Sequence, residues 1–183
     1  LLQSSAASDV YKRQILCCMP SGNNGPTLPA DLSGANLRIG VIRAGWNEGV
    51  VNRLADGVEK ALDRLQVKNA TWVSVPGCLE IPLAAQLLAR SGDFDALVAI
   101  GAVIRGETTH YELVSEGSAT GVLRVQLDTG LPIGFGVVTV EDHEQAMARS
   151  EANGGHNVGD EATEVAVQMA LIAPVSYTHL RAH

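Results

Sequence analysis

Hydrophobic positions along the chain follow two patterns that alternate with each other. Short β-branched runs predict strands, and longer stretches with apolar residues three and four positions apart predict amphipathic helices. The clearest helix begins after Asn47, a residue type suited to a helix N-cap. Its apolar stripe consists of Val51, Leu54, Val58, Ala61, Leu62 and Leu65.

The same reading gives the order of the elements. We expect strands at residues 37–43, 71–75, 96–100 and 132–138. We expect helices at residues 47–65, 80–90, 112–128, 141–150 and 160–173. Strands that alternate with helices are typical of a parallel sheet covered by helices on both faces. The pattern therefore predicts a single α/β domain.

The chemically densest stretch is the loop Gly101–Glu112, which lies between a predicted strand and a predicted helix. In open parallel sheets, ligands bind at the carboxyl ends of the strands. Thr108 and Thr109 offer hydroxyl and backbone N–H groups near a helix N-terminus, which is a common anion site. His110 adds an imidazole, the side chain best suited to proton transfer near neutral pH. We therefore place the functional site at this loop.

Composition narrows the class of protein. Of the 183 residues, 46% are hydrophobic and only 4% are aromatic, which predicts an aliphatic core. The net charge of -7 argues against a nucleic-acid partner, and no apolar run approaches the roughly 20 residues of a membrane span. Cys17, Cys18 and Cys78 show neither metal-ligand spacing nor an even disulfide framework. We expect a cytoplasmic protein without a metal.

Both ends of the chain differ in character from the middle. Residues 1–14 and 174–183 resemble translated adapter sequence, although natural disordered tails would read the same way. The segment up to residue 36 is rich in Gly, Pro, Ser and Asn, which favours a flexible arm or a segment that lies along a neighbouring subunit. We expect the folded domain at residues 37–173.

Several short motifs follow one another within that domain. They are Gly45-Trp46-Asn47, the run from Val75 to Pro82, the run from Gly101 to Tyr111, the run from Pro132 to Gly136, and Glu144-Gln145-Ala146 followed by Arg149. Each motif alone is a weak signal, but their order and spacing together are specific. From Leu37 to Ala173 the chain resembles the 6,7-dimethyl-8-ribityllumazine synthase family of riboflavin biosynthesis.

The resemblance implies a fold, an activity and an assembly. The fold would be a flavodoxin-like three-layer α/β/α sandwich with four parallel strands in the order 2-1-3-4. The activity would be the condensation of 5-amino-6-(D-ribitylamino)uracil with L-3,4-dihydroxy-2-butanone 4-phosphate, which releases phosphate and water without a cofactor or metal. The assembly would be a homopentamer, or a multiple of pentamers, with active sites shared between subunits. Riboflavin synthase becomes a candidate partner.

The resemblance also assigns roles to residues of the pyrimidine side. His110, otherwise a capping or core histidine, would be the general acid/base. Trp46, otherwise a surface aromatic, would stack on the pyrimidine ring. Glu80, otherwise a favourable charge at a helix N-terminus, would accept hydrogen bonds from ribityl hydroxyls. Cys78 and Leu79 would line the same pocket through backbone groups, with no nucleophilic role for the thiol.

The uracil and phosphate contacts would come largely from the loop at 101–112. The backbone of Ala102, Val103 and Ile104 would contact the uracil, although these residues also read as the end of a buried strand. Glu107 and Thr108 match the phosphate-side loop of the family, where the backbone N–H of Glu107 is a better contact for phosphate than its carboxylate. Arg105 is interpreted as structural, paired with a carboxylate of its own subunit.

Two further residues would act across a subunit boundary or on the phosphate. Phe135, otherwise core packing, would reach the site of the adjacent subunit. Arg149, otherwise a solvated cation, would clamp the phosphate with its forked guanidinium. The family commonly has a lysine shortly after this arginine, but residues 155–159 read Gly-His-Asn-Val-Gly here. Either His156 compensates or the phosphate rests on Arg149 and the backbone, and the altered loop makes a capsid-like shell doubtful.

Two other functions are compatible with the same sequence. A non-catalytic module that binds a ribityl compound or a flavin would keep the pocket and leave the phosphate-side groups silent. A purely structural shell protein would need neither. The presence of both His110 and Arg149 favours the enzyme, and the missing lysine is the main point against it.

Overall fold

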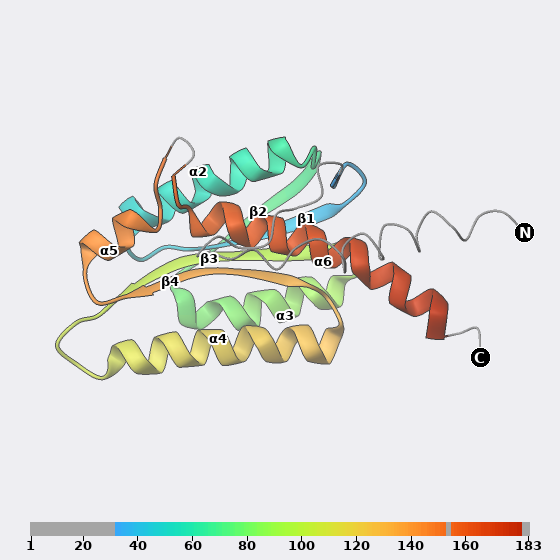
Figure 1. The fold of residues 1–183 in the computed structure, drawn as a ribbon. Coiled ribbons are helices and arrows are strands. Elements are labelled where there is room, and N and C mark those ends of the chain that lie inside the picture. Colours follow the sequence, from blue (N-terminus) through green and yellow to red (C-terminus); the bar gives the residue numbers. More distant parts are fainter. Residues whose placement is uncertain (1–31, 153–154, 181–183) are drawn as a thin grey trace, which may run out of the picture. The chain divides into compact units, whose positions relative to one another are not determined.

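The computed structural model describes residues 32–152 and 155–180. Its centre is a sheet of four parallel strands in the order β2-β1-β3-β4 (Figure 1). The strands are β1 (Arg38–Ala44), β2 (Asn69–Val75), β3 (Ala96–Ile104) and β4 (Ile133–Val140). Within the sheet, Val41 of β1 is paired with Trp72 of β2 and with Val98 of β3. The predicted strand order and direction are confirmed.

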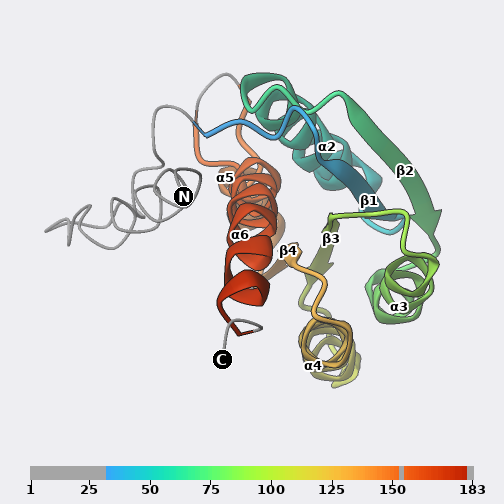
Figure 2. The same cartoon turned by 90° about the vertical axis from the view of Figure 1, so that its right-hand side faces the viewer.

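Helices cover both faces of this sheet. They are α2 (Glu48–Arg64), the short 3-10 helix η1 (Cys78–Glu80), α3 (Ile81–Ser91), α4 (His110–Thr129), α5 (His143–Ala148) and α6 (Val158–Leu180). Figures 1 and 2 show α2 and the beginning of α6 on one face of the sheet and α3 and α4 on the other. This arrangement is the predicted three-layer α/β/α sandwich. Residues 33–170 form one compact unit, and 171–180, the last turns of α6, belong to a second.

The core is aliphatic, as the low aromatic content predicts. β3 is buried from Ala96 to Val103, because it lies inside the sheet with helices on both faces. β2 is the opposite case, an edge strand whose residues are mostly exposed. The largest fully buried side chains include Ile39, Ile42, Leu54, Ile81, Leu97 and Ile100.

Glycines bring two helices close to their neighbours. A Cβ on Gly134 of β4 would collide with the backbone carbonyl of Ala162 in α6, so helix and strand touch backbone to backbone. A Cβ on Gly121 of α4 would meet the ring of Pro82 in α3 at 2.6 Å. Helices therefore pack closely on both faces of the sheet, with α6 against β4 on one face and α4 against α3 on the other.

Several element boundaries differ from the prediction. The third strand was predicted to end at Ile100, but β3 continues through Gly101 to Ile104, because these residues keep pairing with β4 up to Val140. The loop after β3 is consequently shorter than predicted, and α4 starts at His110 rather than at Glu112. Gly101 lies inside the strand, where a Cβ would come too close to the Cys78 sulfur and the Ala44 methyl group.

The C-terminal part shows further differences. The helix predicted at 141–150 is shorter, from His143 to Ala148, because Asp142 caps it by accepting a hydrogen bond from the backbone N–H of Gln145 at 2.8 Å. α6 begins at Val158 and continues to Leu180, past the predicted end at 173. Residues 1–31 of the predicted arm, with Cys17 and Cys18, lie outside the described residues. None of the helices that the structure describes is both long and apolar enough to cross a bilayer.

Candidate active site

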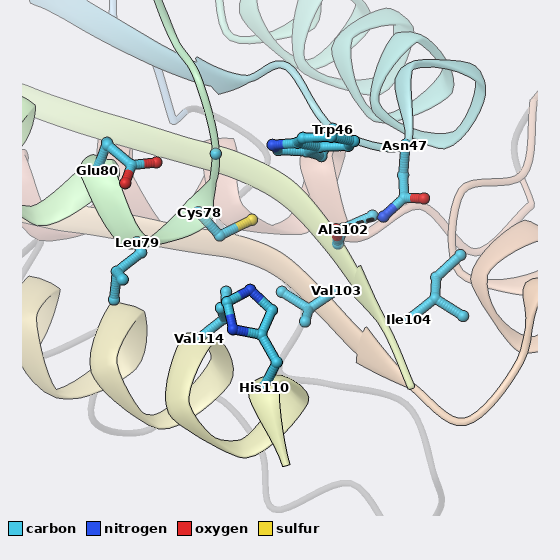
Figure 3. A pocket seen from close by; sticks show the side chains of 11 residues that line it. Trp46, Asn47, Cys78, Leu79, Glu80, Ala102, Val103, Ile104, His110 and Val114 are labelled. Atoms are coloured by element: carbon cyan, nitrogen blue, oxygen red, sulfur yellow. Dashed lines mark hydrogen bonds between the residues drawn. The ribbon is translucent and has the colours of Figure 1, made fainter. Parts of the chain in front are cut away.

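A cavity of about 380 Å³ lies at the carboxyl edge of the sheet, a volume within the range of small-molecule sites. Its walls come from the loops after β1 and β2, the end of β3 and the first turns of α4 (Figure 3). The lining residues are Trp46, Asn47, Gly77, Cys78, Leu79, Glu80, Ala102, Val103, Ile104, His110 and Val114. The cavity lies at the strand end where the sequence predicts the site, and it is therefore the candidate active site.

The loop after β1 carries Trp46 to the mouth of the cavity. It is fastened to the end of β2, because the backbone N–H of Gly45 donates to the carbonyls of Val75 and Pro76 at 2.9 and 3.2 Å. Trp46 is 74% exposed, which leaves its indole ring free to receive a ligand. A Cβ on Gly77 would approach both this ring and the Glu80 carboxylate, so glycine there lets the two side chains share one rim.

Asn47 is the N-cap residue of α2, as predicted, but its side chain does not cap the helix. It adopts the left-handed conformation at φ 59°, and its side-chain amide instead donates to the carbonyl oxygen of Ala102 at 2.9 Å. The side-chain amide is therefore bonded to the end of β3 and not to the helix, and Figure 3 shows this bond along one wall of the cavity.

Cys78 and Glu80 belong to η1, which follows β2. The Cys78 thiol is buried beneath Gly101, and this burial raises its pKa to about 11. The nearby Glu80 charge also raises the pKa, while a hydrogen bond from the Ala102 backbone opposes both effects. The thiol is therefore protonated at neutral pH and lines the cavity as a small apolar group, which agrees with the expectation that it is not a nucleophile.

His110 is the first residue of α4, and Figure 3 shows its imidazole ring entering the cavity from that helix. Val114, one helical turn further on, lies beside it in the lining. The preceding residue Thr109 makes no side-chain capping bond, and the backbone N–H of His110 approaches the hydroxyl of Thr108 at 3.4 Å. Among the lining residues, His110 is the group best suited to carry protons near neutral pH.

The remaining predicted residues do not line this cavity. Glu107 and Thr108 lie in the exposed loop that precedes α4. Phe135 lies in the edge strand β4, where it is paired with Ala99 of β3 and is partly buried against the core. Arg149 follows α5, and its guanidinium donates to the carbonyl of Gln145 at 3.1 Å. The described lining consequently contains no lysine or arginine.

Comparison with known proteins decides the family. The family model described as 6,7-dimethyl-8-ribityllumazine synthase matches residues 36–173. A protein of that name from Burkholderia vietnamiensis (strain G4 / LMG 22486) is 52% identical over 142 residues, which cover 76% of this chain and 81% of the relative. The namesake from Paraburkholderia phytofirmans (strain DSM 17436 / LMG 22146 / PsJN) is 50% identical over 145 residues, or 78% and 83% of the two chains. The chain belongs to the 6,7-dimethyl-8-ribityllumazine synthase family.

Membership in the lumazine synthase family agrees with the flavodoxin-like arrangement of the sheet and helices. Three lining residues were not predicted as part of the site, namely Asn47, Gly77 and Val114. Asn47 belongs to the motif Gly45-Trp46-Asn47, and Gly77 lies in the run from Val75 to Pro82. Val114 lies one helical turn after His110, so a correct prediction of the start of α4 would have located it.

Residues 155–159, where the resemblance implies a lysine, contain none in this chain. His156 lies 3.1 Å from the Glu161 carboxylate, measured from Nε2 to Oε1. Asn157 is buried and donates to the carbonyls of Arg53 and Glu151 at 2.9 and 3.1 Å. Because His156 faces a carboxylate, it is a poor substitute for a free lysine at a phosphate.

Proposed function

We propose that this chain condenses 5-amino-6-(D-ribitylamino)uracil with L-3,4-dihydroxy-2-butanone 4-phosphate to form 6,7-dimethyl-8-ribityllumazine, phosphate and water. The family match supports the activity. The observation that carries the proposal is the cavity at the carboxyl edge of the sheet, which brings together Trp46, Glu80 and His110 from separate segments of the chain.

The pyrimidine substrate would bind between the loop after β1 and the end of β3. The exposed indole of Trp46 offers a flat apolar surface for stacking. The backbone at the end of β3 offers N–H and C=O groups to the edges of the uracil ring. Glu80, on the rim beside Trp46, would accept hydrogen bonds from the ribityl hydroxyls.

His110 would move the protons of the reaction. Attack of the uracil amine on the ketone gives a carbinolamine, which loses water to form an imine. Phosphate is then eliminated, and closure of the ring onto the resulting carbonyl group releases a second water. Each step transfers a proton to or from oxygen, nitrogen or carbon, and an imidazole serves as donor and acceptor near neutral pH. Holding both substrates together would contribute about 7–11 kcal/mol by effective-molarity arguments.

The phosphate side would be completed by a neighbouring subunit. The lining of the cavity within the described chain has no guanidinium, so we propose that Arg149 and Phe135 reach the site of an adjacent copy. Glu107 and Thr108 would meet the phosphate mainly through their backbone N–H groups. Large exposed apolar side chains favour such contacts, and on α3 and α4 they are Leu83, Leu87, Leu113, Leu123 and Leu127. The assembly would be a cytoplasmic homopentamer or a multiple of it, with riboflavin synthase as a candidate partner.

Mixing the two substrates with purified protein tests the proposal directly. The enzyme produces the absorbance of the lumazine, and light scattering on the same sample gives the mass of the assembly. A binding module would take up the ribitylaminouracil without turnover, and a structural shell protein would do neither. Either of these results, or a sample that stays monomeric at high concentration, would overturn the proposal.

A further inference from the structure

We propose that Arg105 is a positioning residue for His110: it clamps the first turn of α4 to the end of the sheet and thereby holds the imidazole in the cavity. The inference rests on the proposed condensation, in which His110 transfers protons. Arg105 does not line the cavity itself, so its effect would pass through the helix that carries His110.

The backbone of Arg105 is fixed to the sheet. Its N–H donates to the carbonyl of Val140, the last residue of β4, at 2.9 Å. The side chain is fixed at the same place, because its Nε lies 2.7 Å from the Glu141 carboxylate. The backbone and the guanidinium of Arg105 are therefore both held at the carboxyl end of β4.

The other side of the guanidinium faces α4. One of its terminal nitrogens pairs with the carboxylate of Glu112. Its central carbon lies 4.1 Å from the centre of the Tyr111 ring, a cation–π distance. Tyr111 and Glu112 are the residues directly after His110 in the first turn of the helix. One side chain thus joins the sheet to the two neighbours of the imidazole.

Other contacts at the start of α4 are weak. Thr109 makes no side-chain capping bond, and the bonds from the N–H groups of His110 and Leu113 to Thr108 and Thr109 are both 3.4 Å long. No atom of the described part of the chain lies within 4 Å of the position of a Cβ on Gly106. The exposed loop between β3 and α4 would therefore let the helix start shift if Arg105 were lost.

Charge distinguishes positioning from phosphate binding. Arg105 pairs with two carboxylates, those of Glu112 and Glu141. These three side chains together carry an excess of negative charge, so they repel an anion. The arginine also holds the pKa of Glu112 below its usual range through their hydrogen bond. Among the residues that the structure describes, the second oxygen of Glu112 has no hydrogen-bond partner, so the pairing with Arg105 is the main contact that offsets its charge.

A double-mutant cycle in the assembled full-length protein tests the role. R105Q should lower kcat about tenfold to a hundredfold, the range expected when a catalytic group is misplaced by about 1 Å, and change KM for each substrate less than about threefold. In an H110A background, R105Q should change kcat less than about twofold, because the group it positions is gone. R105K, which keeps the charge and loses the fork, should recover part of the activity.

Two controls make the result decisive. R38Q removes an arginine that pairs with Asp95 at the amino-terminal end of the strands, far from the cavity at their carboxyl end, and should leave kcat unchanged. If R105Q does not fold, E112A removes the carboxylate that Arg105 pairs with on the helix side and replaces R105Q in the cycle. Equal losses of kcat with and without His110, or an unchanged kcat in R105Q, would overturn the inference.

Failure of the proposed function is separable from failure of this inference. If the wild-type protein forms no lumazine, the proposed function is wrong, and the NMR signals of the His110 ring then decide the positioning role alone. They should shift or broaden in R105Q and stay unchanged in R38Q. Signals that remain the same in both variants would overturn the role of Arg105 without reference to turnover.

Discussion

The side-chain amide of Asn47 donates a hydrogen bond to the backbone carbonyl of Ala102 at 2.9 Å, which fastens the loop after β1 to the end of β3. The two residues are far apart in sequence and form neighbouring walls of the cavity. Asn47 also has a left-handed backbone, at φ 59°, which asparagine tolerates better than most residues. Asn47 thus adopts the left-handed backbone that the turn requires and also supplies the hydrogen bond between the two walls.

Substitutions at Asn47 should separate these two requirements. N47A loses the hydrogen bond, worth about 0.5–1.5 kcal/mol, and adds left-handed strain of about 1–2 kcal/mol. N47G loses the hydrogen bond but tolerates the backbone, so it should be the milder variant by about 1 kcal/mol. Urea unfolding of the three proteins measures the difference. Equal stability of N47A and N47G would mean that the left-handed conformation is not strained in alanine.

The layered fold could be predicted from the sequence because its signals are local. The stripe of α2 and the β-branched runs identified the elements, and the family resemblance supplied the strand order. Boundaries were harder, since they depend on tertiary contacts. Gly101 looked like the end of a strand, yet β3 continues to Ile104 because β4 still offers backbone partners there.

The site was predictable to the extent that it lies on short motifs of one chain. Residues 46, 78–80, 102–104 and 110 were named from the sequence and share one cavity. The bond from Asn47 to Ala102 was not predictable, because an asparagine before a helix ordinarily signals an N-cap. Phe135 and Arg149 lie apart from the cavity of their own chain, so their proposed roles depend on a second subunit.

Gly101 and Cys78 should be energetically coupled. A Cβ on Gly101 would lie 2.5 Å from the Cys78 sulfur and 3.1 Å from the Ala44 methyl group, in a buried part of the site. G101A should therefore destabilise the protein by about 1–3 kcal/mol through overpacking. In C78A the sulfur is gone, so G101A should cost distinctly less there. Denaturant unfolding of the four proteins gives the coupling, and strictly additive losses would contradict the predicted contact.

Lowering the pH should destabilise the fold through Asp95, which pairs with Arg38 at the amino-terminal end of the strands. Hydrogen bonding to Arg38 lowers the pKa of Asp95, which also accepts the Arg38 backbone N–H at 2.8 Å. A carboxyl group with a depressed pKa stabilises the fold fully above its unfolded pKa near 4 and loses this effect as the pH falls through the lower folded value. D95N should therefore be less stable than wild type at pH 7, with the gap closing towards pH 3.

The Cys78 thiol should resist alkylation at neutral pH. Its pKa is raised to about 11 by burial, so only a small fraction is thiolate below pH 9. Alkylation by iodoacetamide, measured by mass spectrometry in a C17S/C18S background, should be slow at pH 7 and accelerate up to about pH 11. Fast modification at pH 7 would show that the thiol is accessible and ionised, and would reopen a chemical role for it.

The last prediction concerns His110 and Arg149, which the cavity of one chain does not bring together. If neighbouring subunits share active sites through a heterologous interface, H110A and R149Q damage opposite sides of each site. H110A should lower kcat by about 10²–10⁴, the usual contribution of general acid–base catalysis. R149Q should chiefly raise KM for the phosphate-bearing substrate, because it removes the proposed anion clamp.

The two damaged chains should then complement each other. When H110A and R149Q are refolded together in equal amounts, about a quarter of the sites in a ring combine an intact His110 from one chain with an intact Arg149 from its neighbour. At substrate concentrations where either variant alone is nearly inactive, the mixed sample should recover a corresponding share of wild-type activity. The same two proteins mixed after separate assembly serve as the control and should stay inactive. A co-refolded sample that forms mixed assemblies, shown by native mass spectrometry, but has no added activity would contradict the shared site.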